Sequence, residues 1–339
     1  MDKYRFPQLH EIVQRLVLLL VWILIVSGAA SCSPPIFGKL EPITIGAPPL
    51  ESSALIYIAD HEGMFANYGI QMTMRDYETG AASLNGLDAG EVDIAVPAEY
   101  ALVGKAFGKD KICVLGSIGK SQYFYIVARE DLGIANFADL KGKKIGVVRN
   151  TIAEFYLGRF LERRGILASQ VTLVDVNIAD SEQVILSGNV DAIMTRPPYI
   201  IPIQERLGDS ALVWEAQNLQ ALYAVLIART DWIADHPELL RQFYRALVQA
   251  EEYLVRHPSE AKSIVQTRLK LDDAYMAAVW SQNQYALSLD QSLIIALEDE
   301  ARWMIKHNLT NEKTTPNFTE YICEDALKAV KPEAVNIIR

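Results

Sequence analysis

An arginine in the middle of the chain has the surroundings of an anion-binding residue. Arg196 stands in the run Thr-Arg-Pro-Pro-Tyr, which ends at Tyr199. A guanidinium presents a planar fork of N–H donors that suits a carboxylate, sulfonate or phosphate group. We predict that Arg196 binds an anionic ligand, with Tyr199 and Tyr123 as aromatic walls. The alternatives are packing for both tyrosines, and for Arg196 a salt bridge within its own domain or with an acidic group such as Glu99.

A helix start supplies a second candidate contact for an anion. Thr151 and Glu154 have the spacing of a capping box, in which Thr151 caps a helix and Glu154 bonds back to it. The following N–H groups, beginning near Ile152, are then free to face an anion, which the helix dipole favours by about 0.3–1 kcal/mol. Arg149 and Asn150 come immediately before. The alternative is that Thr151 and Glu154 only cap the helix.

Two more loops carry candidate ligand contacts. Ser52 and Ser53 follow Pro49 and can cap the next helix while offering a hydroxyl to a ligand. The run that begins at Pro97 contains Glu99, whose carboxylate can accept from an ammonium or guanidinium. A purely structural cap is the alternative for Glu99.

Sequence signatures of catalysis are missing. We find no His/Cys/Asp spacing for a metal, no Gly-x-Ser-x-Gly run and no glycine-rich phosphate loop. His236 and His257 each precede a proline at a predicted helix start, which is a structural use. We therefore predict no catalytic residue, no metal and no cofactor. The net charge of −10 argues against a nucleic acid partner, although it does not exclude an anionic ligand.

These loops lie in an internal repeat of about 100 residues. Ile-Gly, Gly-Ile and Gly-x-Val-Asp landmarks occur in the same order in both copies, and the last of them begins at Gly90 and Gly188. Each copy reads strand, helix, strand, helix, strand, which implies parallel strands with helical crossovers. Two similar α/β lobes with a cleft between them follow, each placing its ligand loops at the carboxyl ends of its strands. Two domains that share short strings by chance are the alternative.

Apolar segments flank the second copy symmetrically. We interpret residues 122–127 and 221–227 as paired hinge strands, which makes the first lobe discontinuous. The expected boundaries are residues 42–123 with 224–339 for the first lobe and 124–223 for the second. Extra C-terminal helices are predicted over residues 237–256, 259–268, 272–287 and 290–307.

The N-terminus has the layout of a secretion signal. Basic residues at positions 3, 5 and 15 precede an apolar stretch of about 15 residues, short of the roughly 20 that a helix needs to cross a bilayer. Small residues then lead to Cys32 and resemble a bacterial lipobox, with Ala29 where leucine is usual. We expect a signal peptide over residues 1–31, lipidation at Cys32 and a tether over 32–41. Ordinary secretion and an uncleaved anchor are the alternatives.

The mature chain would hold two further cysteines. Cys113 lies in a predicted buried strand and Cys323 near the C-terminus. An oxidising compartment permits a disulfide, but two cysteines so far apart in the sequence do not make a framework. We expect two unpaired thiols.

The sequence resembles the SsuA/TauA/NMT1-like (THI5-like) substrate-binding proteins of ABC importers. The resemblance covers roughly Pro42 to Arg268 and rests on five runs: Ile43–Pro49, Ala59–Phe65, Gly90–Ile94, Phe137–Gly146 and Val190–Ala192. It implies the α/β, two-lobed periplasmic binding protein type II fold, with two doubly wound sheets joined by hinge strands. Family members carry sulfonates, taurine, nitrate, bicarbonate or pyrimidine-type compounds.

This chain departs from the family pattern at Arg196, where an acidic residue before proline is common. The resemblance and this departure together imply an extracytoplasmic, lipid-anchored monomer, in the periplasm or on the outer face of the cell membrane. It would capture a small, anionic solute by cleft closure and deliver it to an ABC permease and its ATPase. The alternatives are a ligand-sensing ectodomain and an enzyme on the same fold. Pyrimidine synthase relatives carry a cysteine cluster that this chain lacks.

Overall fold

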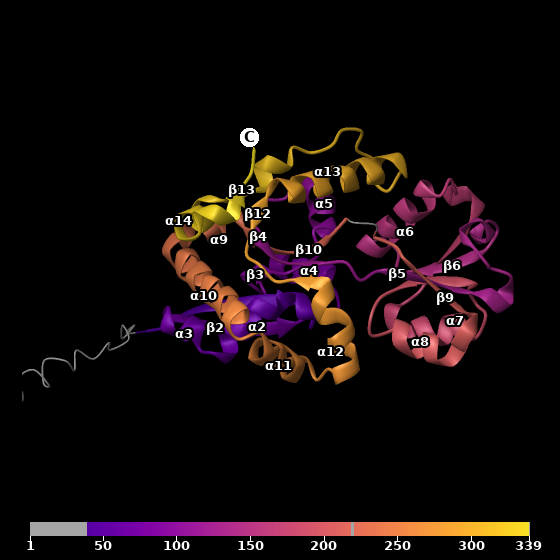
Figure 1. Ribbon diagram of the computed structural model, residues 1–339. Helices are drawn as coiled ribbons and strands as arrows, with labels where there is room; N and C mark the ends of the chain where they lie inside the picture. Colours follow the sequence, from indigo (N-terminus) through magenta and orange to yellow (C-terminus); the bar gives the residue numbers. More distant parts are fainter. Residues whose placement is uncertain (1–38, 218–219, 339) are drawn as a thin grey trace, which may run out of the picture. The chain divides into compact units, whose positions relative to one another are not determined.

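The computed structural model describes residues 39–217 and 220–338, which build two lobes around two separate β-sheets (Figure 1). The predicted signal peptide, Cys32 and most of the tether lie outside the described residues. Within the described part of the chain, no helix is both long and apolar enough to cross a membrane.

The first sheet has six strands in the order β11-β4-β10-β3-β1-β2. Strand β1 pairs in parallel with β2 and β3, whereas β10 runs antiparallel to both β3 and β4. We call the part built on this sheet the first lobe. Its strands are β1 (Glu41–Ala47), β2 (Ile70–Asp76), β3 (Ile94–Ala95), β4 (Ile112–Ser121), β10 (Leu222–Arg229) and β11 (Asn283–Gln284).

The second sheet repeats this arrangement with five strands in the order β7-β6-β8-β5-β9. Strand β6 pairs in parallel with β7 and β8, and β5 runs antiparallel to β8 and β9. We call the part built on this sheet the second lobe. Its strands are β5 (Tyr125–Arg129), β6 (Lys144–Val147), β7 (Thr172–Asp175), β8 (Ala192–Thr195) and β9 (Ala211–Glu215).

The two Gly-x-Val-Asp runs hold equivalent places in the two sheets. Asp93 accepts the N–H of Thr44 in the middle of β1, and Asp191 accepts the N–H of Lys144 at the start of β6. Gly90 and Gly188 both have a positive φ, which glycine adopts without steric cost. The repeat in the sequence is therefore a repeat in the structure.

Helices connect the strands within each lobe and cover the sheets. Along β5, Ile126 packs into one apolar cluster and Val127 into another, because successive side chains of a strand point to opposite faces. The second sheet is therefore buried on both sides. The helices are α2 (Ala54–His61), α3 (Met64–Asn67), α4 (Gly80–Asp88) and α5 (Tyr100–Phe107) in the first lobe, and α6 (Ile152–Arg163), α7 (Ser181–Leu186) and α8 (Ile200–Leu207) in the second.

The chain crosses between the sheets twice, after β4 and after β9, and the two crossings are hydrogen-bonded to each other. The N–H of Ala216 donates to the carbonyl of Phe124 (2.9 Å), and the N–H of Phe124 donates to Oε1 of Gln217 (2.8 Å). Gln217 also donates to the carbonyl of Ser121 (2.9 Å). The strands predicted as a paired hinge do not pair with each other, because residues 125–127 belong to β5 of the second sheet and residues 222–227 to β10 of the first. The hydrogen bonds instead join the crossing residues between the sheets. The lobe boundaries given above remain a prediction.

The C-terminal part is mainly helical, and one of its predicted helices is wrong in length. The helix expected over residues 272–287 ends at Val279, because Asn283 and Gln284 pair instead with the edge of β4 as strand β11. Tertiary pairing there overrides local helix propensity. The helices are α9 (Thr230–Asp235), α10 (Pro237–Arg256), α11 (Pro258–Leu269), α12 (Asp273–Val279), α13 (Gln291–Lys306) and α14 (Asp325–Val330), and the short strands β12 (Leu289–Asp290) and β13 (Val335–Asn336) form a parallel pair.

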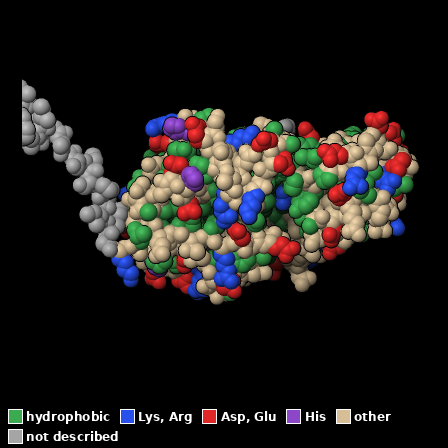
Figure 2. Space-filling view, turned by 90° about the horizontal axis from the view of Figure 1, so that it is seen from below, with side chains coloured by type: hydrophobic (Ala, Val, Ile, Leu, Met, Phe, Trp, Pro, Cys, Tyr) green, Lys and Arg blue, Asp and Glu red, His purple; other side chains and the backbone are tan. Residues whose placement is uncertain are grey.

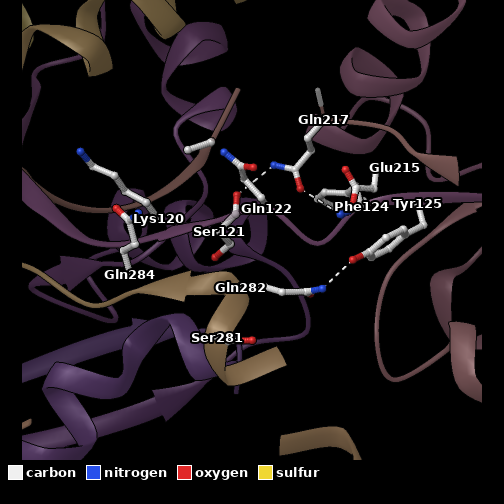
Figure 3. Close-up of a pocket in the computed structure, with 11 residues that line it drawn as sticks. Lys120, Ser121, Gln122, Phe124, Tyr125, Glu215, Gln217, Ser281, Gln282 and Gln284 are labelled. Atoms are coloured by element: carbon white, nitrogen blue, oxygen red, sulfur yellow. Dashed lines mark hydrogen bonds between the residues drawn. The ribbon is translucent and has the colours of Figure 1, made fainter. Parts of the chain in front are cut away.

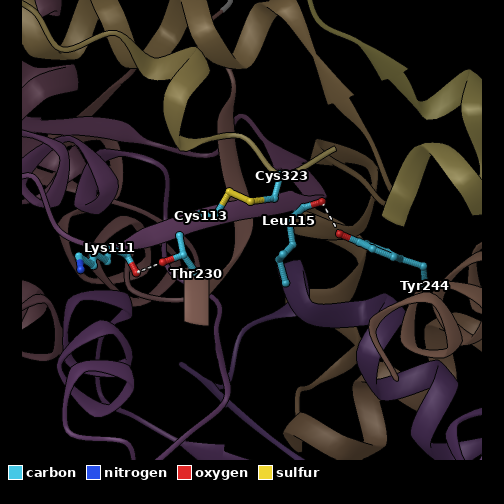
Figure 4. The surroundings of a disulfide bond; sticks show 6 residues. All are labelled: Lys111, Cys113, Leu115, Thr230, Tyr244 and Cys323. Atoms are coloured by element: carbon cyan, nitrogen blue, oxygen red, sulfur yellow. Dashed lines mark hydrogen bonds between the residues drawn. A yellow bond between two sulfur atoms is a disulfide. The ribbon is translucent and has the colours of Figure 1, made fainter. Parts of the chain in front are cut away.

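The expectation of two unpaired thiols is wrong, because Cys113 and Cys323 form a disulfide (Figure 4). Their Cα atoms lie 5.8 Å apart although 210 positions separate them in the sequence. The N–H of Cys323 donates to the carbonyl of Val114 at 3.0 Å, so the C-terminal segment lies along β4. The disulfide fixes this segment to the centre of the first lobe.

Helix α13 contacts the second lobe as well as the first. The ring of Trp303 packs edge-on against Phe155 of α6, with 5.4 Å between the ring centroids. Lys306 and His307 both contact Glu162 near the end of α6, at 2.6 and 3.2 Å. Figure 1 shows α13 above α5 and β10, extending towards α6.

The charged side chains on the face shown in Figure 2 are interspersed by sign. Several exposed charges form pairs within a helix, such as Arg241 with Glu238 and Arg302 with Glu298. Exposed pairs of this kind contribute about 0–1 kcal/mol each. They therefore add little to the stability of the fold.

Candidate functional site

The candidate site is built from loops at the carboxyl ends of parallel strands in both lobes. This is where open α/β sheets place their ligands. Glu51, Ser52 and Ser53 follow β1, Pro97 and Glu99 follow β3, Arg149 to Thr151 follow β6, and Arg196 and Tyr199 follow β8.

Arg196 is partly buried among aromatic rings. Its guanidinium carbon lies 5.8 Å from the ring centroid of Tyr123 and 5.8 Å from that of Tyr199. One guanidinium nitrogen donates to the carbonyl of Pro197 at 3.0 Å. Among the described residues no carboxylate lies within ion-pair distance of it, so neither of the alternatives, a pairing with Glu99 or a local salt bridge, occurs. The remaining donors are available to an anion.

Glu51 is one of the residues of this site that the sequence analysis did not identify. It lies in a 3₁₀ turn before α2 and is only 1% exposed. Its Oε2 accepts a 3.0 Å hydrogen bond from the hydroxyl of Tyr275, while Oε1 has no hydrogen-bond partner among the described residues. Burial alone would lower the pKa of Arg196, but Tyr123 and Glu51 raise it, with a net upward shift. The carboxylate therefore acts on the guanidinium without touching it.

Tyrosine hydroxyls surround these two charges. Burial raises the pKa of Tyr123 to about 12, and the charge of Glu51 adds to the rise. Burial and Glu51 also raise the pKa of Tyr275 and of Tyr285. The hydroxyl of Tyr285 has no partner among the described residues. These groups stay protonated at neutral pH and can donate hydrogen bonds.

The helix start at Thr151 differs in detail from the predicted capping box. Oγ1 of Thr151 accepts from Ala153 at 3.2 Å, but Glu154 accepts the N–H of Asn150 instead of that of Thr151. Asn150 has a φ of 58°, which turns its N–H towards Glu154. Glu154 also pairs with Arg149 at 2.8 Å, so the charge of Arg149 is already balanced within the lobe. The helix is capped, and Arg149 is a weaker candidate than Arg196.

The remaining predicted ligand contacts differ in how exposed they are. Pro49 is exposed and Pro97 is buried, with its carbonyl accepting from Val225 at 3.0 Å. Ser52 and Ser53 are buried, but the side chain of Ser53 does not cap α2 because Ser53 itself belongs to the preceding 3₁₀ turn. Ile152 packs in the core of the second lobe.

Glu99 is fully buried and faces a second carboxyl group. Its Oε2 accepts the N–H of Tyr223 at 2.9 Å. Burial raises the pKa of Glu99 to about 8. Burial and then the charge of Glu99 raise the pKa of Glu300, on α13, well above its usual range. A proton on Glu300 relieves the repulsion between the two groups, so the pair carries one negative charge at most near neutral pH.

A polar pocket of about 420 Å³ lies beside the hinge (Figure 3). It is lined by residues of both crossing segments and by the segment before β11, and Nε2 of Gln282 donates to the hydroxyl of Tyr125 at 2.5 Å across it. It contains neither Arg196 nor Glu51, and its Lys120 is paired with Asp290 at 2.6 Å. We therefore treat it as part of the hinge.

The sequence gives no clear signal for the missed residues Glu51, Tyr275 and Glu300. Glu51 stands in the same loop as Ser52, but a single acidic residue in a loop gave no reason to prefer it. Tyr275 and Glu300 lie on helices at the spacing of core residues.

Among the described residues no three His, Cys, Asp or Glu side chains gather in a way that could hold a metal ion.

The chain is similar to proteins of a known family. The family model described as NMT1/THI5 like matches residues 51–261. A "Putative binding protein" of Brucella abortus is 27% identical over 227 residues, which is 66% of this chain and 69% of that protein. A "Putative aliphatic sulfonates-binding protein" of Bacillus subtilis is 26% identical and covers 69% of this chain and 71% of its own length.

An enzyme is also among the relatives. The 4-amino-5-hydroxymethyl-2-methylpyrimidine phosphate synthase of Aspergillus parasiticus is 23% identical, covering 61% of this chain and 64% of the enzyme. Among solved structures, the periplasmic aliphatic sulphonate binding protein SsuA from Escherichia coli superposes with a TM-score of 0.70 at 16% identity, covering 85% of this chain and 99% of SsuA. This likeness confirms the two-lobed periplasmic binding protein fold.

Proposed function

The chain belongs to the NMT1/THI5-like family, and from this premise we propose that it is an extracytoplasmic solute-binding protein that carries a small, acid-bearing solute to an ABC permease. The observation that carries the proposal is the state of Arg196. Its guanidinium is partly buried beside Tyr123 and Tyr199 and has no carboxylate within ion-pair distance among the described residues. Removing a charge from water is costly unless an opposite charge compensates it, and an anionic solute does so.

Binding couples to closure because the two lobes contribute different groups. Arg196 and Tyr199 come from the second lobe, whereas Glu51 and Tyr275 come from the first. The hydrogen-bonded crossings near Phe124 and Ala216 are the segments that bend. A solute that contacts both lobes favours the closed state by its differential affinity for that state. A permease and its ATPase then read the closed form.

The proposed location outside the cytoplasm is supported by the disulfide between Cys113 and Cys323, because disulfides persist in oxidising compartments. We place the chain in the periplasm or on the outer face of the cell membrane, as a monomer attached through a lipid at Cys32. The proposed lipid attachment rests on the sequence pattern before Cys32.

The proposal is binding without conversion, although a synthase is among the relatives. The two cysteines of the described residues are joined in a disulfide, so they do not supply the thiol cluster associated with pyrimidine synthases. The arrangement around Arg196 provides charge and hydrogen-bond donors for holding an anion.

A thermal-shift screen of the purified full-length chain tests this function. The compounds are sulfonates, nitrate, bicarbonate, carboxylates, pyrimidines and amines. We expect at least one acid to raise the melting temperature, and we expect the same acid to be recovered unchanged after prolonged incubation. Stabilisation by neutral or cationic compounds alone would contradict the anion assignment, and steady consumption of a stabilising compound would show that the protein is an enzyme.

A further inference from the structure

Two opposite charges from different lobes act on the same tyrosines. The guanidinium of Arg196 lies 5.8 Å from the ring of Tyr123, and the carboxylate of Glu51 is hydrogen-bonded to Tyr275. Tyr123 and Tyr275 each respond to both charges, since Glu51 raises and Arg196 lowers the pKa of each. Glu51 and Arg196 therefore both act on the same two buried tyrosines.

The two charges do not satisfy each other. Neither Glu51 nor Arg196 has an ion-pair partner within bonding distance among the described residues. Tyr275 occupies only one oxygen of Glu51, and the other oxygen is buried without a partner in the described structure. A buried carboxylate oxygen without a donor is costly, and a bound solute that carries an N–H group would remove this cost.

We propose that Glu51 is a specificity-determining residue that binds a protonated nitrogen of the solute while Arg196 binds its acid group, so that the solute is a small zwitterion. This inference rests on the proposed function and adds the requirement for a cationic N–H group. Tyr275 prepares the site because its hydrogen bond holds one oxygen of the carboxylate and leaves the other oxygen for the solute.

The chemistry of the free oxygen restricts the cation. An acceptor oxygen is satisfied by an N–H donor, which a primary, secondary or tertiary ammonium or an amidinium carries. A quaternary ammonium bears the same charge without an N–H group and leaves Oε1 unpaired. Charge-assisted hydrogen bonds are the stronger ones, so the loss of this contact is measurable as a change in affinity.

The test compares matched ligands on the unmodified full-length chain by calorimetric titration. The probes are 2-aminoethanesulfonate, ethanesulfonate and the N,N,N-trimethyl derivative of the first, with the corresponding three-carbon sulfonates and carboxylates as further sets. In at least one set we expect the amine to bind at least about tenfold more tightly than the analogue without nitrogen and than the trimethyl analogue. This comparison uses no variant, so it stands even where a substitution disturbs folding.

A substitution then assigns the effect to Glu51. We expect Glu51→Gln to remove the preference for the amine and to leave the binding of the nitrogen-free anion within about threefold of wild type. The control Glu205→Gln changes an exposed carboxylate on α8 and leaves the preference intact. Equal affinity for amine and nitrogen-free anion, or an unchanged preference in Glu51→Gln, overturns the inference.

The outcomes separate this inference from the proposed function. An anion that binds through Arg196 without a nitrogen requirement contradicts the role of Glu51 and leaves the solute-binding function standing. A chain that binds no compound from these sets or from the wider screen contradicts both.

Discussion

The hydroxyl of Tyr275 donates a 3.0 Å hydrogen bond to Oε2 of Glu51, which links α12 to the loop after β1. Both residues are almost fully buried. We expect Tyr275→Phe to lower the free energy of unfolding by about 1–3 kcal/mol, because it leaves a buried carboxylate oxygen without its donor. Urea denaturation of the ligand-free protein measures the change.

Tyr285→Phe is the matched control for this substitution. Tyr285 is also buried, but its hydroxyl has no partner among the described residues. Its removal should leave the stability within about 0.5 kcal/mol of wild type or raise it. Equal losses in the two variants would show that the hydrogen bond to Glu51 contributes nothing specific.

The buried carboxyl pair Glu99 and Glu300 makes stability fall as pH rises. The pKa of Glu99 is raised from an ordinary 4.5 to about 8, and that of Glu300 is also raised, so the folded chain holds protons that the unfolded chain releases. This contribution is complete below the ordinary value of 4.5 and is lost as pH rises through about 8.

Urea unfolding at about pH 5, 7 and 9 measures this slope. We expect Glu300→Gln to reduce the decline, because a neutral amide replaces a group that must lose its proton. Glu298→Gln on the same helix changes an exposed carboxylate and should leave the slope as in wild type. A stability that is flat over this range in the wild type would exclude a protonated pair.

The disulfide should contribute substantially to stability. It joins Cys113 on β4 to Cys323 near the C-terminus and closes a loop with a sequence separation of 210. Reduction should cost about 2–4 kcal/mol of unfolding free energy, because the unfolded chain regains the freedom of that loop. The comparison is urea denaturation with and without reductant, with the Cys113→Ala, Cys323→Ala double variant as control. A double variant as stable as the oxidised wild type, or still sensitive to reductant, would disagree with this role.

Two helix glycines provide opposite tests of packing. A Cβ at Gly158 on α6 would lie 2.7 Å from the ring of Trp303, so Gly158→Ala must displace a buried ring and should destabilise the protein by about 1–3 kcal/mol. A Cβ at Gly104 on α5 meets no atom within 4 Å, so Gly104→Ala should stabilise by about 0.5–1 kcal/mol through helix propensity. Thermal melting of both variants gives the signs. A neutral Gly158→Ala would mean that α13 does not pack on α6 as described.

The architecture could be predicted from the sequence because short local motifs mark the two copies of the repeat. The two Gly-x-Val-Asp runs recur at equal places in both sheets, and Asp93 and Asp191 make the same hydrogen bond there. Turns and strand starts depend on residues that are neighbours in the sequence, so they can be recognised from a single sequence. The helix expected through residue 287 was wrong because pairing with the edge of β4, a distant strand, decides that segment.

The candidate site was only partly predictable for the same reason. Arg196 stood out because a basic residue replaces the acidic residue that is common before proline in the family pattern, and the structure leaves it without an ionic partner among the described residues. Glu51 could not be identified from its own loop, because its hydrogen-bond partner Tyr275 lies more than 200 positions away in the sequence. The disulfide likewise depends on the return of the C-terminal segment to β4. No local pattern in the sequence encodes these long-range contacts.

The most direct test of the central claim is a calorimetric titration of the full-length chain with the stabilising acid, in wild type and in Arg196→Gln. Arg206→Gln serves as control, because Arg206 is an exposed arginine on α8 of the same lobe. We predict saturable one-to-one binding in wild type and in Arg206→Gln, and affinity at least about tenfold weaker in Arg196→Gln, as expected for the loss of a charge-assisted hydrogen bond. Equal affinity in all three proteins would contradict the account.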